Sequence, residues 1–157
     1  MNIKTTNPDW EKIGKKYELR LFPINLTDNK YPVAGDKISA GFPAYAENFK
    51  TDPISIDKLL IKRPYSSFII KVEGESMIDA GIYPNSYIVI DTGFDPQHMS
   101  IVVARLYDEF VVKRILIFDD HAVLKAENSK RTYPDIRVDD SSDIEIWGVV
   151  TGTFMQL

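Results

Sequence analysis

Six short apolar segments follow one another between residues 68 and 151, and turn residues separate them. They are Phe68–Val72, Tyr87–Asp91, Ile101–Leu106, Phe110–Leu116, Ala122–Lys125 and Ile144–Thr151. Each is rich in β-branched or aromatic residues and is shorter than a typical helix. Asp108-Glu109 and Asp119-Asp120-His121 have the composition of tight turns between consecutive segments. Repeated short strands with little helix predict a mainly β fold, antiparallel and partly closed.

A single short helix is predicted before the first strand. Ser55 can cap it, Ile56, Leu59 and Leu60 would share one face, and Pro64 follows its end. A length of 157 residues suits one globular domain. The first 40 residues contain three prolines among scattered polar residues and show no pair of helices. We therefore expect an extended N-terminal arm (residues 1–40) and a folded domain (residues 41–157), without a helix-turn-helix DNA reader.

The charge of the chain is unevenly distributed. Residues 1–40 carry seven Lys/Arg and five Asp/Glu, whereas residues 41–157 carry twelve and eighteen. An acidic domain binds phosphate backbones poorly, so we expect no direct sequence-specific DNA binding. The sequence has neither an apolar signal segment near Met1 nor a run long enough to span a bilayer. The absence of cysteine fits a reducing compartment, so we expect a cytoplasmic protein.

One serine stands out because of what surrounds it. Ser76 lies in Glu73-Gly74-Glu75-Ser76-Met77, directly after an apolar strand. A serine after a glycine turn is most often an ordinary turn residue. It becomes a nucleophile only when a neighbouring base takes the proton of its hydroxyl group.

A lysine that could supply this base interrupts a later apolar strand, 37 residues after Ser76. Strand alternation places Lys113 on one face with Val111 and Ile115. Burial among aliphatic side chains disfavours the charged ammonium and lowers the pKa of a lysine. The ordinary alternative is an edge lysine whose stem covers apolar surface and whose amine reaches water.

The third element is a segment of small residues upstream of both. Ser39-Ala40-Gly41-Phe42-Pro43 places the Ala40–Gly41 bond between small side chains. Such a segment can enter a narrow groove as an extended strand, with Gly41 leaving room for attack on the Ala40 carbonyl carbon. Composition alone fits a flexible linker equally well.

Together these residues resemble the LexA/UmuD family of self-cleaving serine peptidases, and the UmuD branch most of all. Further parts of the resemblance are Tyr87-Ile88-Val89-Ile90-Asp91, Ile101-Val102-Val103-Ala104 and Val111-Val112-Lys113. One departure is His98-Met99-Ser100, where the family usually has Gly-Asp in the turn. The resemblance implies the LexA/signal-peptidase type of β fold and spans roughly Ser39 to Phe154.

Several functional expectations follow from this resemblance alone. Ser76 would be the nucleophile, Lys113 the general base, Ala40–Gly41 the cleaved bond, and the backbone N–H groups of Ser76 and Met77 the oxyanion hole. The implied role is an SOS-response accessory subunit of an error-prone translesion polymerase. Implied partners are a second copy of the chain, a RecA–single-stranded-DNA filament as activator and a UmuC-type polymerase, with no metal or cofactor.

Two other functions remain open from the sequence. The fold could serve only dimerisation and partner binding in a non-enzymatic regulator, or it could be the oligomerisation domain of a repressor. His98 and His121 fit solvated loops better than a histidine-based triad. Asp79, Asp91 and Asp95 fit turns better than a metal site.

Overall fold

The structure is a computed structural model that describes residues 26–27, 29–32, 53–107 and 109–157. Seven strands form one antiparallel sheet. They are β1 (Ser67–Lys71), β2 (Tyr87–Asp91), β3 (Ile101–Leu106), β4 (Glu109–Ile117), β5 (Ala122–Lys125), β6 (Ile136–Val138) and β7 (Ile144–Phe154). Helix α2 covers Ile56–Leu60 and a 3-10 turn, η1, covers Ile78–Ala80. The prediction of a mainly β, antiparallel fold with one short helix is confirmed.

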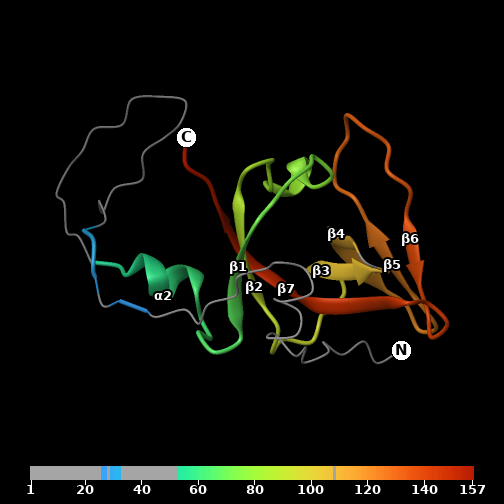
Figure 1. The fold of residues 1–157 in the computed structure, drawn as a ribbon, viewed down its shortest axis with the longest axis horizontal. Coiled ribbons are helices and arrows are strands. Elements are labelled where there is room, and N and C mark those ends of the chain that lie inside the picture. Colours follow the sequence, from blue (N-terminus) through green and yellow to red (C-terminus); the bar gives the residue numbers. More distant parts are fainter. Residues whose placement is uncertain (1–25, 28, 33–52, 108) are drawn as a thin grey trace.

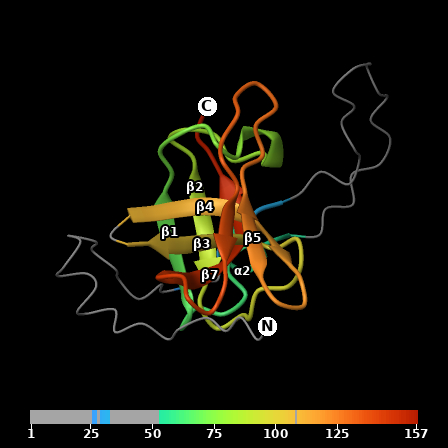
Figure 2. The same ribbon diagram turned by 90° about the vertical axis from the view of Figure 1, so that its right-hand side faces the viewer.

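The last strand lies in the middle of the sheet. The spatial order is β1-β2-β7-β3-β4-β5-β6, so β7 pairs with β2 along one edge and with β3 along the other. Figure 1 shows β7 in dark red running from the β5–β6 end towards β1 and β2. Figure 2 shows the strong twist of the sheet, because β3 and β4 run across the direction of β1. Among the described residues no pairing joins β1 to β6, so the sheet stays open.

The core consists of two apolar clusters that meet at the central strands. Val103 and Trp147 belong to one cluster, and their chain neighbours Val102 and Ile146 belong to the other. Successive side chains of a strand point to opposite faces, so β3 and β7 are covered on both sides. The strand that pairs with β4, β3, is therefore packed on both faces.

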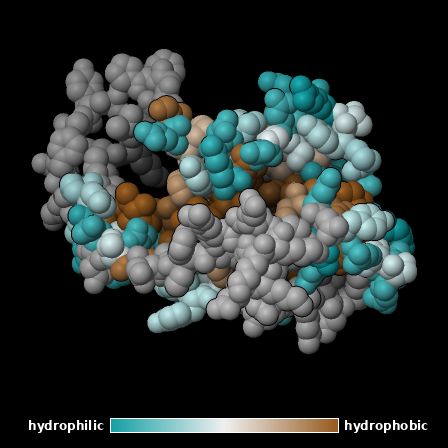
Figure 3. All heavy atoms as spheres, viewed as in Figure 1, coloured by the Kyte–Doolittle hydropathy of each residue, from teal (hydrophilic) through white to brown (hydrophobic). Residues whose placement is uncertain are grey.

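The short helix begins where the sequence predicted. The Ser55 Oγ accepts a hydrogen bond from the Lys58 backbone N–H at 3.3 Å, which caps the helix. Ile56 and Leu59 remain largely exposed. Figure 3 shows apolar side chains around α2 and across the middle of the same face, with polar side chains beyond them. No helix in the described part of the chain is long and apolar enough to cross a membrane.

Part of the N-terminal region contacts the segment that leads into α2. The backbones of Tyr31 and Ile54 exchange two hydrogen bonds of 2.8 and 2.9 Å. The backbone N–H and the hydroxyl of Thr27 both donate to the Asp57 carboxylate, at 2.8 and 2.7 Å. These two hydrogen bonds lower the pKa of Asp57. The contacts therefore join segments that precede and follow the predicted cleavage position, which itself lies outside the described residues.

Candidate active site

Ser76 lies in the loop that joins β1 to η1. Gly74 turns the chain with φ of 90°, a left-handed conformation that favours glycine. Met77, directly after the serine, is 2% exposed and belongs to the apolar cluster that contains Trp147. The loop is therefore fixed on one side of Ser76 by a glycine turn and on the other by a buried side chain.

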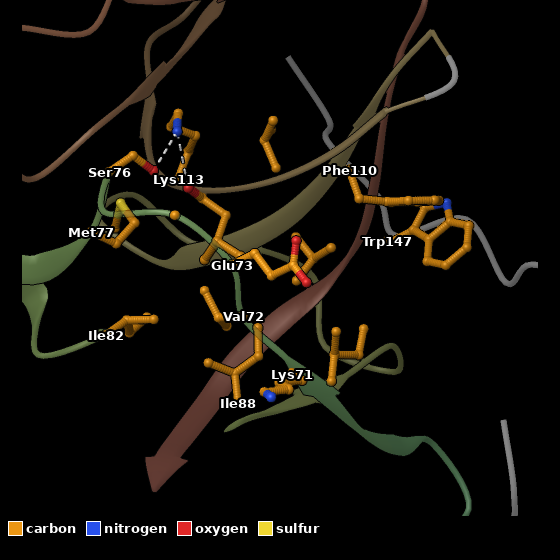
Figure 4. A pocket seen from close by; sticks show the side chains of 15 residues that line it. Lys71, Val72, Glu73, Ser76, Met77, Ile82, Ile88, Phe110, Lys113 and Trp147 are labelled. Carbon is orange, nitrogen blue, oxygen red and sulfur yellow. Dashed lines mark hydrogen bonds between the residues drawn. The ribbon is translucent and has the colours of Figure 1, made fainter. Parts of the chain in front are cut away.

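The structure brings Lys113 to Ser76. Lys113 lies on β4 and is 7% exposed. Of its neighbours on the same strand face, Ile115 belongs to a buried apolar cluster and Val111 packs against that cluster, as the strand alternation predicted. Its Nζ donates to the Ser76 Oγ at 2.8 Å and to the Val112 carbonyl oxygen at 3.3 Å. Figure 4 shows the two side chains pointing toward each other, joined by a dashed line.

The surroundings of Lys113 favour its neutral form. Burial lowers the pKa of the Lys113 ammonium, because the low-dielectric interior penalises the charge. The ring of Tyr133 lies 5.7 Å from Nζ, a separation at which a cation–π contact weakly favours the charged form. Burial therefore shifts the amine toward the neutral state, which can accept a proton.

Two backbone N–H groups flank the side chain of the serine. Within the described residues, the N–H groups of Ser76 and Met77 donate to no backbone or side-chain acceptor. Their own carbonyl oxygens do accept: the Met77 oxygen from Ala80 and Ile82, and the Ser76 oxygen from Glu127. Paired N–H groups of this kind can stabilise a negatively charged oxygen.

The residues that hydrogen-bond to the backbone of the serine loop were not identified from the sequence. They belong to the β5–β6 connector, residues 126–135. The Glu127 N–H donates to the Ser76 carbonyl oxygen at 2.8 Å, and the Asn128 side-chain amide donates to the Glu75 carbonyl oxygen at 2.7 Å. Arg114 forms two 2.8 Å bonds to the Glu127 carboxylate. The clue available was the polar pair Glu127-Asn128 two residues after the end of a strand, which is a weak signal.

An apolar cavity of about 330 Å³ opens beside Ser76 and Lys113. Its lining includes Ile70, Val72, Met77, Phe110, Val112 and Trp147. Figure 4 shows the side chains of Ser76 and Lys113 at one side of this pocket and those of Phe110 and Trp147 at the other. The end of β1 and the Glu73–Gly74 segment also line the cavity. A wall made of strand residues next to a serine hydroxyl suits an extended peptide.

The remaining predicted residues separate into two groups. Ala40 and Gly41 lie outside the described residues, so their proximity to Ser76 stays a prediction. His98 bonds through Nδ1 to the backbone of Ile117, and His121 contacts Asp120 at 2.7 Å. The structure joins neither histidine to the serine through a hydrogen bond in the described part of the chain.

Of the three aspartates considered for a metal site, Asp91 has a structural role that the sequence did not show. It is the last residue of β2, is 1% exposed and pairs with Arg63 at 2.7 Å. Its carboxylate also accepts from the Ser66 hydroxyl at 2.8 Å. The contacts tie the segment after α2 to the end of β2.

Comparison with known proteins gives the family. A family model described as Peptidase S24-like matches residues 32–151. Protein MucA of Salmonella typhimurium is 31% identical over 121 residues, which cover 76% of this chain and 81% of that protein. Protein ImpA of Shigella flexneri is 34% identical over 126 residues, covering 79% of this chain and 84% of that protein. A LexA repressor of Anaeromyxobacter dehalogenans is 29% identical over 126 residues, covering 80% of this chain and 55% of the repressor. The resemblance to LexA/UmuD-type proteins is thereby confirmed, and the chain belongs to the Peptidase S24-like family.

Proposed function

We propose that this chain is a self-cleaving serine peptidase in which Ser76 is the nucleophile and Lys113 the general base. The 2.8 Å contact between the Lys113 amine and the Ser76 hydroxyl is the observation that carries the proposal. A buried lysine with a lowered pKa can take the hydroxyl proton, whereas a solvated, charged lysine cannot. Membership of a peptidase family supports the same assignment.

The reaction would begin when neutral Lys113 accepts the Ser76 proton and Oγ attacks the Ala40 carbonyl carbon. The carbonyl oxygen becomes negatively charged and accepts hydrogen bonds from the Ser76 and Met77 N–H groups. The Ala40–Gly41 bond then breaks, and the protonated Lys113 gives its proton to the Gly41 amine. Water, deprotonated by Lys113, hydrolyses the Ala40 ester and regenerates the Ser76 hydroxyl.

The apolar cavity would hold the substrate segment as an extended strand. The substrate belongs to the same chain, so tethering raises its effective concentration at Ser76 far above that of a separate peptide. A dyad that is only partly in its reactive protonation state is then sufficient, because each molecule needs one cleavage.

The biological role that we propose is that of a UmuD-like protein of the SOS response. The processed form would be a homodimeric accessory subunit of a UmuC-type translesion polymerase, and a RecA–single-stranded-DNA filament would stimulate cleavage. The support is the similarity to MucA and ImpA, of which this chain covers 81% and 84%. The LexA repressor is matched over 55% of its length.

The test is the mass of the fragments. Purified chain incubated at alkaline pH, with and without a RecA–single-stranded-DNA filament, should split into residues 1–40 and 41–157. The Ser76→Ala variant, which lacks only one hydroxyl group, should stay intact under the same conditions. A different N-terminal residue on the larger fragment would contradict the assignment of Ala40–Gly41. An intact wild-type chain under every condition would favour the non-enzymatic regulator.

A further inference from the structure

Two consecutive carbonyl groups of the serine loop are held by two consecutive residues of the β5–β6 connector. The Glu75 oxygen accepts from the Asn128 side-chain amide at 2.7 Å, and the Ser76 oxygen accepts from the Glu127 N–H at 2.8 Å. Both partners belong to the same short connector, so both carbonyl groups point toward it. The side chain of Asn128 is partly buried at this contact.

Because a peptide unit is planar, these contacts also determine the direction of the N–H groups of Ser76 and Met77. A trans peptide unit is planar, and its C=O and N–H point in opposite directions. The Glu75 carbonyl shares its unit with the Ser76 N–H, and the Ser76 carbonyl shares its unit with the Met77 N–H. Fixing the two carbonyl groups on the connector therefore directs both N–H groups away from it. These are the two N–H groups assigned above to the oxyanion hole.

The connector is itself held by the strand that carries the base. Arg114, next to Lys113 on β4, donates to both carboxylate oxygens of Glu127 at 2.8 Å. The Asp79 N–H donates to the Glu127 carbonyl oxygen at 2.9 Å, which also links the connector to η1, the turn that follows the serine loop. A bidentate pair of arginine and carboxylate restricts both orientation and distance. The Arg114–Glu127 pair thus links the strand that carries Lys113 to the connector that orients the N–H groups of Ser76 and Met77.

We propose that Asn128 is a positioning residue that orients the Ser76 N–H toward the oxyanion, an inference that rests on the proposed peptidase function. Asn128 touches neither the nucleophile nor the base through any described hydrogen bond; it acts through the Glu75 carbonyl. Without its amide donor the Glu75 carbonyl oxygen keeps only the longer 3.4 Å bond from the Ile78 N–H, so the Glu75–Ser76 peptide unit loses the shorter of its two hydrogen bonds. The donor would then be misdirected when negative charge develops on the substrate oxygen.

Two variants separate the amide donor from the rest of the side chain. The Asn128 Oδ1 accepts from the Lys130 N–H at 2.9 Å, a contact that shapes the connector. Asn128→Ala removes both contacts, whereas Asn128→Asp keeps an acceptor for Lys130 and removes the donor to Glu75. Lys130→Ala is the matched control, since this exposed side chain lies on the same connector and leaves both contacts intact.

The measurement is the rate of self-cleavage of the full chain from pH 6 to 11, together with the melting temperature of each variant. Loss of one oxyanion donor costs about 10²–10³ in rate, and a misdirected donor costs less, so we expect a fall of about 10- to 100-fold at the plateau. Asn128→Ala should leave the pH midpoint unchanged, because that midpoint reports Lys113 and no charge is added or removed. Lys130→Ala should cleave like the wild type.

The outcomes distinguish this inference from the proposed function. If the wild-type chain cleaves and Asn128→Asp cleaves at the same rate, the positioning role is overturned and the Ser76–Lys113 assignment stays intact. A slower Asn128→Ala whose pH midpoint has moved would also overturn it, since the residue would then act through the base. A wild-type chain that never cleaves would overturn both proposals.

Discussion

The dependence of self-cleavage on pH is the sharpest consequence of a buried lysine base. Only the neutral amine of Lys113 can accept the Ser76 proton, so the rate should follow the neutral fraction. With an ordinary lysine pKa of about 10.4, about one side chain in a thousand is neutral near pH 7.4. Burial lowers the pKa of Lys113, and each unit of lowering raises that fraction tenfold, equivalent to about 1.4 kcal/mol.

The expected profile has three features. Below the lowered pKa the logarithm of the rate should rise by about one for each pH unit, and above it the rate should be constant. The midpoint should lie below the value of a solvated lysine, because Lys113 is only 7% exposed. Lys113→Arg should be inactive across the range, because a guanidinium group stays charged.

The assay is gel densitometry or intact mass after timed incubation of the full chain between pH 6 and 11. Ser76→Ala gives the background of non-enzymatic hydrolysis. If Lys113→Ala still cleaves with the same dependence on pH as the wild type, the role of Lys113 as the base is refuted. A flat profile throughout would refute any titrating base.

Two further predictions concern stability, measured by denaturant unfolding in the Ser76→Ala background. The folded pKa of Lys113 lies below the unfolded one, so between the two values the unfolded state binds more protons and stability rises with pH. As the pH rises toward 10, the free energy of unfolding of Ser76→Ala should therefore rise relative to that of Ser76→Ala with Lys113→Met, by about 1.4 kcal/mol for each unit by which folding lowers the pKa of Lys113. If the free energies of the two variants depend on pH in the same way, the burial of the charge is contradicted. Gly148→Ala should cost about 1–3 kcal/mol, because its Cβ would lie 3.0 Å from the Asp91 carbonyl oxygen. In the matched variant Gly152→Ala the nearest atom is the Leu60 Cδ2 at 3.6 Å, so an equal loss in both variants would contradict this explanation.

The strands show how far local pattern determines the fold. Three of the six predicted segments, Tyr87–Asp91, Ile101–Leu106 and Ala122–Lys125, have the observed bounds. The pattern works there because β-branched runs between turn residues fit a pleated surface. It missed β6, Ile136–Val138, because three residues are too few to show a period of two. That strand forms through antiparallel pairing of its backbone with β5.

The order of the strands could not be read from their sequence. β7 is the last strand in the described part of the chain and lies between β2 and β3, so it pairs with two partners that precede it by 38 positions or more. Sequential pairing is a good first guess for hairpins, but it gives β7 the wrong neighbours. β7 carries apolar residues on both faces, which suits a central strand, but this pattern does not show which strands are its partners.

For the site, the sequence determined the chemical types and the tertiary structure decided their relation. Ser76 after a glycine turn and Lys113 among aliphatic residues could be identified from local context, because both signals lie within a few positions along the chain. The 2.8 Å contact between them arises from the path of the chain between β1 and β4, which no local pattern encodes. Asn128 and Glu127 were invisible for the same reason: they act on backbone carbonyl groups some 50 residues away. Side-chain identity is written in the sequence, whereas the direction of a peptide N–H depends on which distant group holds the carbonyl of its unit.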